Sequence, residues 1–394
     1  MAQTDGHVNG SGDVGGSGEA DWADFAHTGP GTLAGRYLRT FWQPVFRSQD
    51  LQPGKAAPIR IMSEDLTLYR GQTGMAHALA FRCAHRGTQL STGWVDGDNI
   101  RCRYHGWMYA PSGQCVQQPA EVAPFCERVQ IRAYPAQEYL GFVFVYVGEA
   151  EPPPLPRYPA MEREGDLQVT LHYRDCNYFN NMDNAIDELH HYFVHWNRKR
   201  PVAEQVIPRI SGEEVGYGIR ISMRRPDEDR AWVWHYHMPG ILQMNTSDTD
   251  QSVHWRVPVD DETHLIPSCT LTPTGTERHR RVAPGEEDPI EDSRKISDIG
   301  QAIRAGRLTI EDIELGGTYF PIGDDVTQLG QGVIADRQHE RLGSSDAALI
   351  LFRNIWKREL RALAEGRPLT QWKHPDRELL ATPRFEIIEG VTGR

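Results

Sequence analysis

The chain has 394 residues, 39% of them hydrophobic and 24% charged, which is enough for about two globular domains. Its net charge of −12 at pH 7 argues against general nucleic-acid binding, so we expect no nucleic-acid partner. No apolar run approaches the ~20 residues of a membrane span, and we recognise no signal peptide. We therefore expect a cytoplasmic protein with no membrane partner, and the six cysteines show no dense disulfide pattern.

The first part of the chain predicts a small β domain. Residues 1–20 are rich in Gly and Ser and predict a disordered tail, followed by an N-terminal extension at 21–37. From 38 to 148, short apolar or alternating runs are separated by Gly, Pro and Asp, a pattern typical of antiparallel strands. The Pro-rich segment 149–159 cannot continue a sheet, so it predicts a stiff linker.

Four candidate metal ligands lie in two short segments of this β domain. Cys83 and His85 are two positions apart, and Cys102 and His105 are three apart, so each segment supplies one thiolate and one imidazole. Two Cys and two His are the ligands of a Rieske [2Fe–2S] cluster, which transfers single electrons. A structural zinc site is the alternative, but zinc sites usually pair like ligands, as CxxC followed by HxxxH. The mixed pairs therefore favour the iron–sulfur cluster.

Residues 160–394 predict a larger domain of mixed structure. We expect one helix near 178–197 and another near 345–365, with strands at stretches such as GIRISMR, AWVWHYHM and SCTLTPT. The predicted fold class is α+β, with a small antiparallel β domain and a larger helix-grip-like domain of antiparallel sheet and helices.

The first predicted helix contains Asp187, His190 and His195 in the pattern DxxHxxxxH. Asp187 and His190 share a helical face, whereas His195 lies about 140° around the helix from His190. Both imidazoles can meet one metal only if the helix is irregular or ends nearby. Two imidazoles and a carboxylate form the facial triad of non-haem Fe(II) oxygenases. The alternative is that these histidines are ordinary surface or core residues.

The segments CAHRGTQLS and CRYHGWMY, followed by DxxHxxxxH, resemble the catalytic α subunit of Rieske non-haem iron oxygenases over about residues 38–365. In the cluster loops, the resemblance implies that Tyr104 and Trp107 pack over the cluster. It also implies that Gly87 and Gly106 let backbone N–H groups approach the cluster sulfurs.

The same resemblance implies that His190 and His195 bind a mononuclear iron. It assigns to Asp187 a bridge between this iron and a cluster His of the neighbouring subunit in a homotrimer. It places the third iron ligand at the start of the C-terminal helix, where GSSDAALILFRNIW indicates Asp346, with Asp336 as second choice.

The stretch WRVPVDDETH (Trp255 to His264) and the QPAE segment near Pro119 resemble the homotrimeric branch that contains phenoxybenzoate dioxygenases and aryl O-demethylases. The resemblance implies a terminal oxygenase that hydroxylates or O-demethylates a substituted aromatic acid or ether, using O₂ and electrons from NAD(P)H. Ring cis-dihydroxylation and N-demethylation are alternatives within the family. A Rieske electron carrier without oxygenase activity and a zinc-stabilised binding protein are alternatives from other classes.

The electrons must come from another protein, because the chain contains neither a GxGxxG-type nucleotide fingerprint nor a plant-type ferredoxin Cys run. We therefore expect a separate reductase with flavin and an iron–sulfur centre, with or without a ferredoxin.

Overall fold

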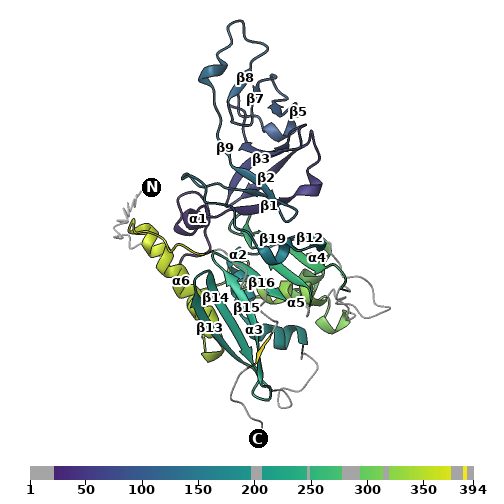
Figure 1. Cartoon of the computed structure of the whole chain (residues 1–394), viewed down its shortest axis with the longest axis vertical. Coiled ribbons are helices and arrows are strands. Elements are labelled where there is room, and N and C mark those ends of the chain that lie inside the picture. The colour runs from purple at the N-terminus through teal and green to yellow at the C-terminus, as the bar shows by residue number, and fades with distance from the viewer. Residues whose placement is uncertain are drawn as a thin grey trace, which may run out of the picture.

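The computed structural model describes residues 22–196, 206–245, 249–276, 293–313, 319–373 and 385–387. A small β part lies at one end of the molecule and a larger part of sheet and helices at the other (Figure 1). The predicted α+β class is confirmed. The tail predicted at residues 1–20 lies outside the described residues. None of the described helices is long and apolar enough to cross a membrane.

The small part consists of three antiparallel sheets that follow one another toward the tip. The first, nearest the larger part, has the order β1 (Gln43–Arg47), β11 (Phe142–Val145), β10 (Ala136–Tyr139). The second has the order β2 (Ala56–Ile61), β3 (Glu64–Arg70), β4 (Ala76–Ala80), β9 (Ala133–Tyr134). The third, at the tip, has the order β5 (Trp94–Asp96), β6 (Asn99–Arg101), β7 (Met108–Tyr109), β8 (Cys115–Gln117).

The larger part is built on an antiparallel sheet of nine strands. Seven of them follow the order β12 (Gly165–Arg174), β19 (His264–Pro273), β17 (Gln251–His254), β16 (Ile241–Asn245), β15 (Arg230–His237), β14 (Gly218–Arg224), β13 (Arg209–Val215). Two short strands pair outside this path, β18 (Val257–Pro258) with β19 and β20 (Phe385–Ile387) with β15. The predicted strands GIRISMR and SCTLTPT correspond to β14 and the second half of β19.

Helices cover this sheet. They are α2 (Tyr178–Ile186), α3 (Glu188–His190), α4 (Ser293–Arg304), α5 (Tyr319–Gly330) and α6 (Ala347–Ala364), while α1 (Leu33–Leu38) packs on α6. The two helices predicted from the sequence correspond to α2–α3 and to α6. The sequence analysis did not predict α4 or α5, and α5 proves important for the site.

One hydrophobic core continues from the large sheet into the small part, and a second surrounds the cluster segments. The turn between β2 and β3 reinforces the junction, because the N–H groups of Met62 and Ser63 donate to the carbonyls of Pro258 and Val259 at 2.8 and 2.9 Å. The small part is therefore anchored by backbone hydrogen bonds as well as by side-chain packing.

The N-terminal extension also belongs physically to the larger part. Phe25 stacks on Phe179 of α2 with ring centroids 4.6 Å apart, and its carbonyl accepts a hydrogen bond from the Tyr178 hydroxyl at 2.5 Å. Asn177, the N-cap of α2, donates to the carbonyl of Ala26 at 2.9 Å. Residues before the β part thus stabilise the first turn of the helix that leads to the site.

Candidate metal centres

Two loops of matching construction carry the four predicted cluster ligands. In each loop, the glycine four residues after the cysteine has a positive φ, 74° at Gly87 and 72° at Gly106. The N–H of each glycine donates to the carbonyl of its cysteine, at 2.9 and 3.1 Å. Arg82 and Arg101, which precede the cysteines, donate to the carbonyls of the same glycines at 2.9 Å. Glycine adopts positive φ without steric cost, so it permits this tight turn in both loops.

The two loops bring all four predicted ligands together. The Cys83 and Cys102 side chains are 2% and 1% exposed and interact with each other, and the rings of His85 and His105 lie with centroids 4.5 Å apart. Nδ1 of His85 is buried without a hydrogen-bond partner among the described residues, as expected of a nitrogen that binds a metal. Two thiols and two imidazoles facing one another suit a Rieske cluster.

Aromatic residues hold the imidazole ligands in place. The Trp107 ring stacks on His85 with centroids 4.5 Å apart and planes 6° apart, and Tyr104 lies over His105 at 3.8 Å. The Tyr109 hydroxyl lies 3.2 Å from the Cys83 sulfur, and the sequence analysis had not singled it out. If Cys83 binds a cluster as a thiolate it can only accept, so Tyr109 would donate to it, and such hydrogen bonds help to set the potential of an iron–sulfur cluster.

The helix that carries DxxHxxxxH is irregular, as the sequence analysis required if both histidines share a metal. α2 stops at Ile186, because Asp187 leaves the helical region with φ −88° and ψ 88° and caps the next turn by accepting from Leu189 N–H at 3.0 Å. A π-helical turn over His191–Trp196 follows α3. It changes the angular spacing, so that the rings of His190 and His195 lie with centroids 5.3 Å apart.

A carboxylate from a distant helix completes this site. Asp324 of α5 places Oδ1 3.5 Å from Nε2 of His190 and 3.3 Å from Nε2 of His195. The His195 ring is clamped by Phe320, one turn earlier on α5, at a centroid distance of 3.6 Å. We call the irregular segment Tyr178–Trp196, which comprises α2, α3 and the π-helical turn, the His helix. The site is thus formed by α5 packing against this His helix.

The structure differs from the sequence prediction at this third ligand. Asp346 lies at the start of α6 as expected, but its carboxylate accepts from the N–H of Gly343 at 2.6 Å and closes the turn there. Asp336 is exposed and pairs with His339 at 2.6 Å. The carboxylate beside the two histidines is therefore Asp324. An acidic side chain at the start of a helix often accepts a hydrogen bond from a backbone N–H and so caps the turn. Asp346 has this capping role here.

Hydrogen bonding prepares His190 to bind through Nε2. Its Nδ1 donates to the backbone carbonyl of Asp187, which can only accept, so the lone pair of the neutral ring is on Nε2, facing Asp324. Burial alone would lower the pKa of His190, but the hydrogen bond and charge of Asp324 outweigh it and raise this pKa to about 9. A metal bound at Nε2 would therefore replace the proton that this nitrogen shares with Asp324. Burial lowers the pKa of His195. Both nitrogens of this buried ring have no hydrogen-bond partner among the described residues.

Two further side chains approach the same point. The Asn184 amide, from the last turn of α2, lies 3.2 Å from Nε2 of His190 and 3.2 Å from Oδ1 of Asp324. His191 offers a ring nitrogen within the same 4.8 Å group as His190 and His195, but its Nδ1 is held by the buried Glu188 at 2.8 Å. Two neutral imidazoles and one carboxylate suit Fe(II), so the residues fit the facial triad.

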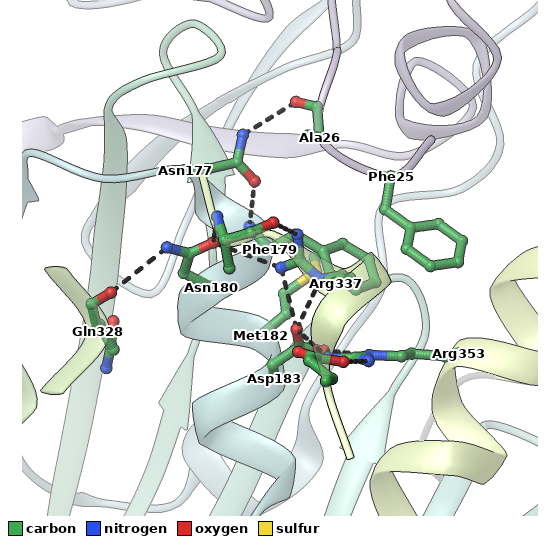
Figure 2. Close-up of polar contacts among 12 residues, drawn as sticks. Phe25, Ala26, Asn177, Phe179, Asn180, Met182, Asp183, Gln328, Arg337 and Arg353 are labelled. Carbon is green, nitrogen blue, oxygen red and sulfur yellow. Dashed lines mark hydrogen bonds and ion pairs between the residues drawn. The ribbon is translucent and has the colours of Figure 1, made fainter. Parts of the chain in front are cut away.

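Buried polar contacts fix α2 against both α5 and α6 (Figure 2). Arg353 of α6 binds the Asp183 carboxylate through two hydrogen bonds, at 2.7 and 3.0 Å, and Arg337 approaches the same carboxylate at 2.9 Å. Asn180 donates to the carbonyl of Gln328, in the last turn of α5, at 3.4 Å and to that of Gly332, just past the helix, at 3.0 Å. These contacts determine where the His helix and Asp324 meet.

Comparison with known proteins agrees with this architecture. Residues 41–135 match the family model described as the Rieske [2Fe-2S] domain. Over 364 residues the chain is 31% identical to the α subunit of phenoxybenzoate dioxygenase from Ectopseudomonas oleovorans, covering 85% of this chain and 84% of that protein. The chain belongs to the Rieske non-haem iron oxygenases.

Other members of the family extend the comparison. The chain is 28% identical to the oxygenase subunit of 5,5'-dehydrodivanillate O-demethylase from a Sphingobium species, covering 86% of this chain and 80% of that protein. Its fold resembles the terminal oxygenase of carbazole 1,9a-dioxygenase from Nocardioides aromaticivorans IC177, with a TM-score of 0.59 at 17% identity over 82% of this chain and 94% of that one. The protein is therefore a Rieske oxygenase subunit, with a [2Fe–2S] cluster and a mononuclear iron, and a separate partner protein supplies its electrons.

Proposed function

We propose that this oxygenase binds its mononuclear iron through His190, His195 and Asp324 and its cluster through the four residues of the matched loops, Cys83, His85, Cys102 and His105. The observation that supports the iron site most directly is the Asp324 carboxylate, within 3.5 Å of Nε2 of both histidines. When bound, the iron supplies O₂ activation and the cluster supplies electrons one at a time. The chain's own residues position these groups and shape their surroundings.

We also propose that electrons pass between subunits of a homotrimer through Asp187. The cluster loops lie near the tip of the small part, whereas α3 lies low in the larger part (Figure 1). Asp187 adjoins His190, its carbonyl being the acceptor for Nδ1 of that ring. Burial raises the pKa of the Asp187 carboxyl, and its Oδ1 accepts one backbone hydrogen bond, from Leu189. An imidazole N–H from a neighbouring cluster would be a suitable donor to its other oxygen, and a closed ring of three subunits would supply one to each site.

The substrate proposed here is an aromatic carboxylate, and Arg256 is the reason. Arg256 follows β17 and reaches α2, where Nε donates to Oδ1 of Asn181 at 2.7 Å, while Nη1 donates to the carbonyl of His254 at 3.0 Å. The guanidinium is surrounded by protein, and burial lowers its pKa, yet the residue keeps accessible surface. An arginine in such surroundings is stable only when an anion compensates its charge.

The nearest acids do not provide that compensation by direct contact. Among the described residues, Arg256 forms no ion pair within 4.0 Å, although Asp324 and Glu188 are near enough to act on its charge. Asp324 is already shared by His190 and His195. A substrate carboxylate bound to the free Nη2 of Arg256 would therefore lie on the iron side of α2, with the rest of the molecule directed toward Asp324.

The sheet face behind α2 is filled by the protein's own core. Tyr236 of β15 also reaches α2, with its hydroxyl 3.5 Å from the Met182 carbonyl. The same face of β14 and β15 carries Ile221 opposite Trp234, both buried. Tyr236 packs edge-on against Phe352 of α6 at a centroid distance of 5.1 Å, so this face belongs to the core and supports α2 from behind.

The experiment offers the reduced enzyme matched pairs of substrates, with electrons from NAD(P)H through an added flavin and iron–sulfur reductase. Each pair consists of a methoxylated aromatic acid and its methyl ester. Formaldehyde and phenol report O-demethylation, a hydroxylated product reports mono-oxygenation, and a cis-diol reports dihydroxylation. We expect turnover of the acids and little turnover of the esters. Equal turnover of both members of each pair contradicts the carboxylate proposal while leaving the iron site intact.

A further inference from the structure

Two cysteines outside the proposed ligand set lie together beside the cluster. Cys115 begins β8 and is 2% exposed, and Cys126 begins the short 3₁₀ turn Cys126–Arg128 and is half-buried. Both pack into the core that contains Cys83 and Cys102. β8 and the turn that carries Cys126 pack against each other, and the two thiols interact electrostatically.

The backbone holds this pair in register. The N–H of Cys115 donates to the carbonyl of Val129 at 2.9 Å, and the N–H of Val129 donates to the carbonyl of Cys126 at 2.9 Å. The amide of Gln114 donates to the carbonyls of Cys126 and Cys115 at 2.7 and 3.2 Å. One side-chain nitrogen thus bridges the two cysteine backbones, and the strand and the turn cannot separate without breaking it.

Cys115 and Cys126 each lie near side chains that surround the cluster ligands. Cys115 is close enough to Cys83 and Tyr109 to act on them electrostatically, and the Tyr109 hydroxyl lies 3.2 Å from the Cys83 sulfur. On the other side, Phe125 precedes Cys126 and packs edge-on against Trp107 at a centroid distance of 5.5 Å. Trp107 in turn stacks on His85. A change in the spacing of the two sulfurs would therefore reach both a sulfur ligand and an imidazole ligand.

We propose that Cys115 and Cys126 form a reversible disulfide under peroxide and that this disulfide shifts the reduction potential of the Rieske cluster. A disulfide draws two sulfurs to about 2.05 Å, closer than two unbonded thiols can lie. The turn that carries Phe125 would move toward β8, which alters the packing on Trp107 and the polarity around the cluster. Hydrogen bonding and solvent exposure are among the factors that set cluster potentials.

The chemistry balances with hydrogen peroxide as the named oxidant. The half-buried Cys126 thiol attacks one peroxide oxygen, giving a sulfenic acid and one water. The Cys115 sulfur then attacks the sulfenic sulfur, the S–O bond breaks, and the hydroxyl leaves as water with the proton from Cys115. Two thiols give up two electrons in total and peroxide accepts them. Cys126 is half-buried whereas Cys115 is 2% exposed, so peroxide reaches Cys126 first.

The test uses the holoenzyme with its cluster intact, as judged by its visible absorption. The protein is treated with hydrogen peroxide, alkylated in denaturant, digested and analysed by mass spectrometry. We expect a peptide pair cross-linked through Cys115 and Cys126, loss of two alkylatable thiols, and recovery of both after dithiothreitol. Cys126→Ser and Cys115→Ala should each abolish the cross-link. Cys269→Ala, which changes a buried cysteine of β19, should behave as wild type.

The second readout is the midpoint potential of the cluster before and after oxidation of the pair. A shift that dithiothreitol reverses, and that is absent in Cys126→Ser, supports the coupling. If both cysteines stay alkylatable after peroxide treatment, or if the only cross-link joins Cys83 to Cys102, the proposed pair does not exist. A Cys115–Cys126 disulfide that leaves the potential unchanged would refute the coupling to the cluster.

Discussion

Oδ1 of Asp324 lies 3.3 Å from Nε2 of His195, although one residue is on α5 and the other on the π-helical turn after α3. The neighbouring imidazoles of His190 and His195 hold the pKa of Asp324 well below its usual range, although burial alone would raise it. An ionised carboxylate that faces two imidazoles is suited to bind a divalent cation. The consequences of this contact can be tested separately from those of the cluster.

Asp324→Ala should remove the mononuclear iron and leave the cluster in place. The loss of a direct ligand should lower turnover by more than the roughly 10–100-fold typical of residues that only support a ligand. Iron and sulfide analysis, with the visible spectrum of the cluster, checks the result. Asp346→Ala is the matched control, because this carboxylate caps the turn before α6. Retention of iron by Asp324→Ala and its loss from Asp346→Ala would restore the sequence-based assignment.

Asp346, the predicted ligand, and Asp324, the observed neighbour of the histidines, show which parts of the site the sequence can predict. The cluster loops were predictable because ligand types and spacing are local, and the structure places Cys83, His85, Cys102 and His105 together. The irregular His helix was predictable because two histidines about 140° apart cannot otherwise share a metal. The expected strands and the terminal helix follow from periodicity in the same way.

Asp324 was not predicted as a ligand because the sequence of its helix, α5, does not look helical. The segment YFPIGDDVTQLG contains Pro321 and two glycines, which usually indicate a loop, and adjacent acids usually indicate solvent exposure. The signal that could have identified the helix is the spacing of Ile322, Val326 and Leu329, four and then three positions apart. Even so, the distance to His195 depends on packing between distant segments, which no local pattern encodes.

Asp187→Asn should separate electron transfer from metal binding. The backbone carbonyl that orients His190 remains, so both metal sites should stay filled. The neutral amide removes the charged acceptor proposed for a neighbouring imidazole. We expect the cluster to be reduced normally but to stay reduced when mixed rapidly with O₂ and substrate, with product formation nearly abolished. Stopped-flow absorbance of the cluster measures this, and reoxidation at the wild-type rate would exclude Asp187 from the electron path.

Arg256→Gln should weaken the binding of aromatic acids without changing the iron site. A hydrogen bond to a charged group contributes about 1.5–3 kcal/mol, so KM for an acid should rise about 10- to 150-fold. The KM of a methyl ester should change little, because an ester has no charge to lose. Steady-state kinetics with one acid and its ester checks the difference, and Arg256→Lys should recover part of the affinity. An equal rise for both substrates would indicate a general packing defect instead.

Asp183→Ala should destabilise the larger part of the protein. The Asp183 and Arg353 side chains are 9% and 10% exposed, and Arg337 shares the same carboxylate, so this change leaves two buried guanidinium groups without their common partner. Removing one member of a buried pair costs about 3–5 kcal/mol, and because Arg353 keeps its contact with Glu340 at 3.0 Å we expect a loss near the lower end of this range. Chemical denaturation followed by circular dichroism measures the loss.

Glu214→Ala provides the control for that experiment, because Glu214 also pairs with an arginine through two hydrogen bonds, at 2.8 and 3.0 Å from Arg358. Its side chain is 36% exposed and that of Arg358 is 44% exposed, so solvent screens the pair. Such surface pairs contribute about 0–1 kcal/mol. If the two variants lose the same stability, the contacts of Asp183 do not anchor α2. If only Asp183→Ala is destabilised and it also binds less iron, the position of the His helix depends on this buried ion pair.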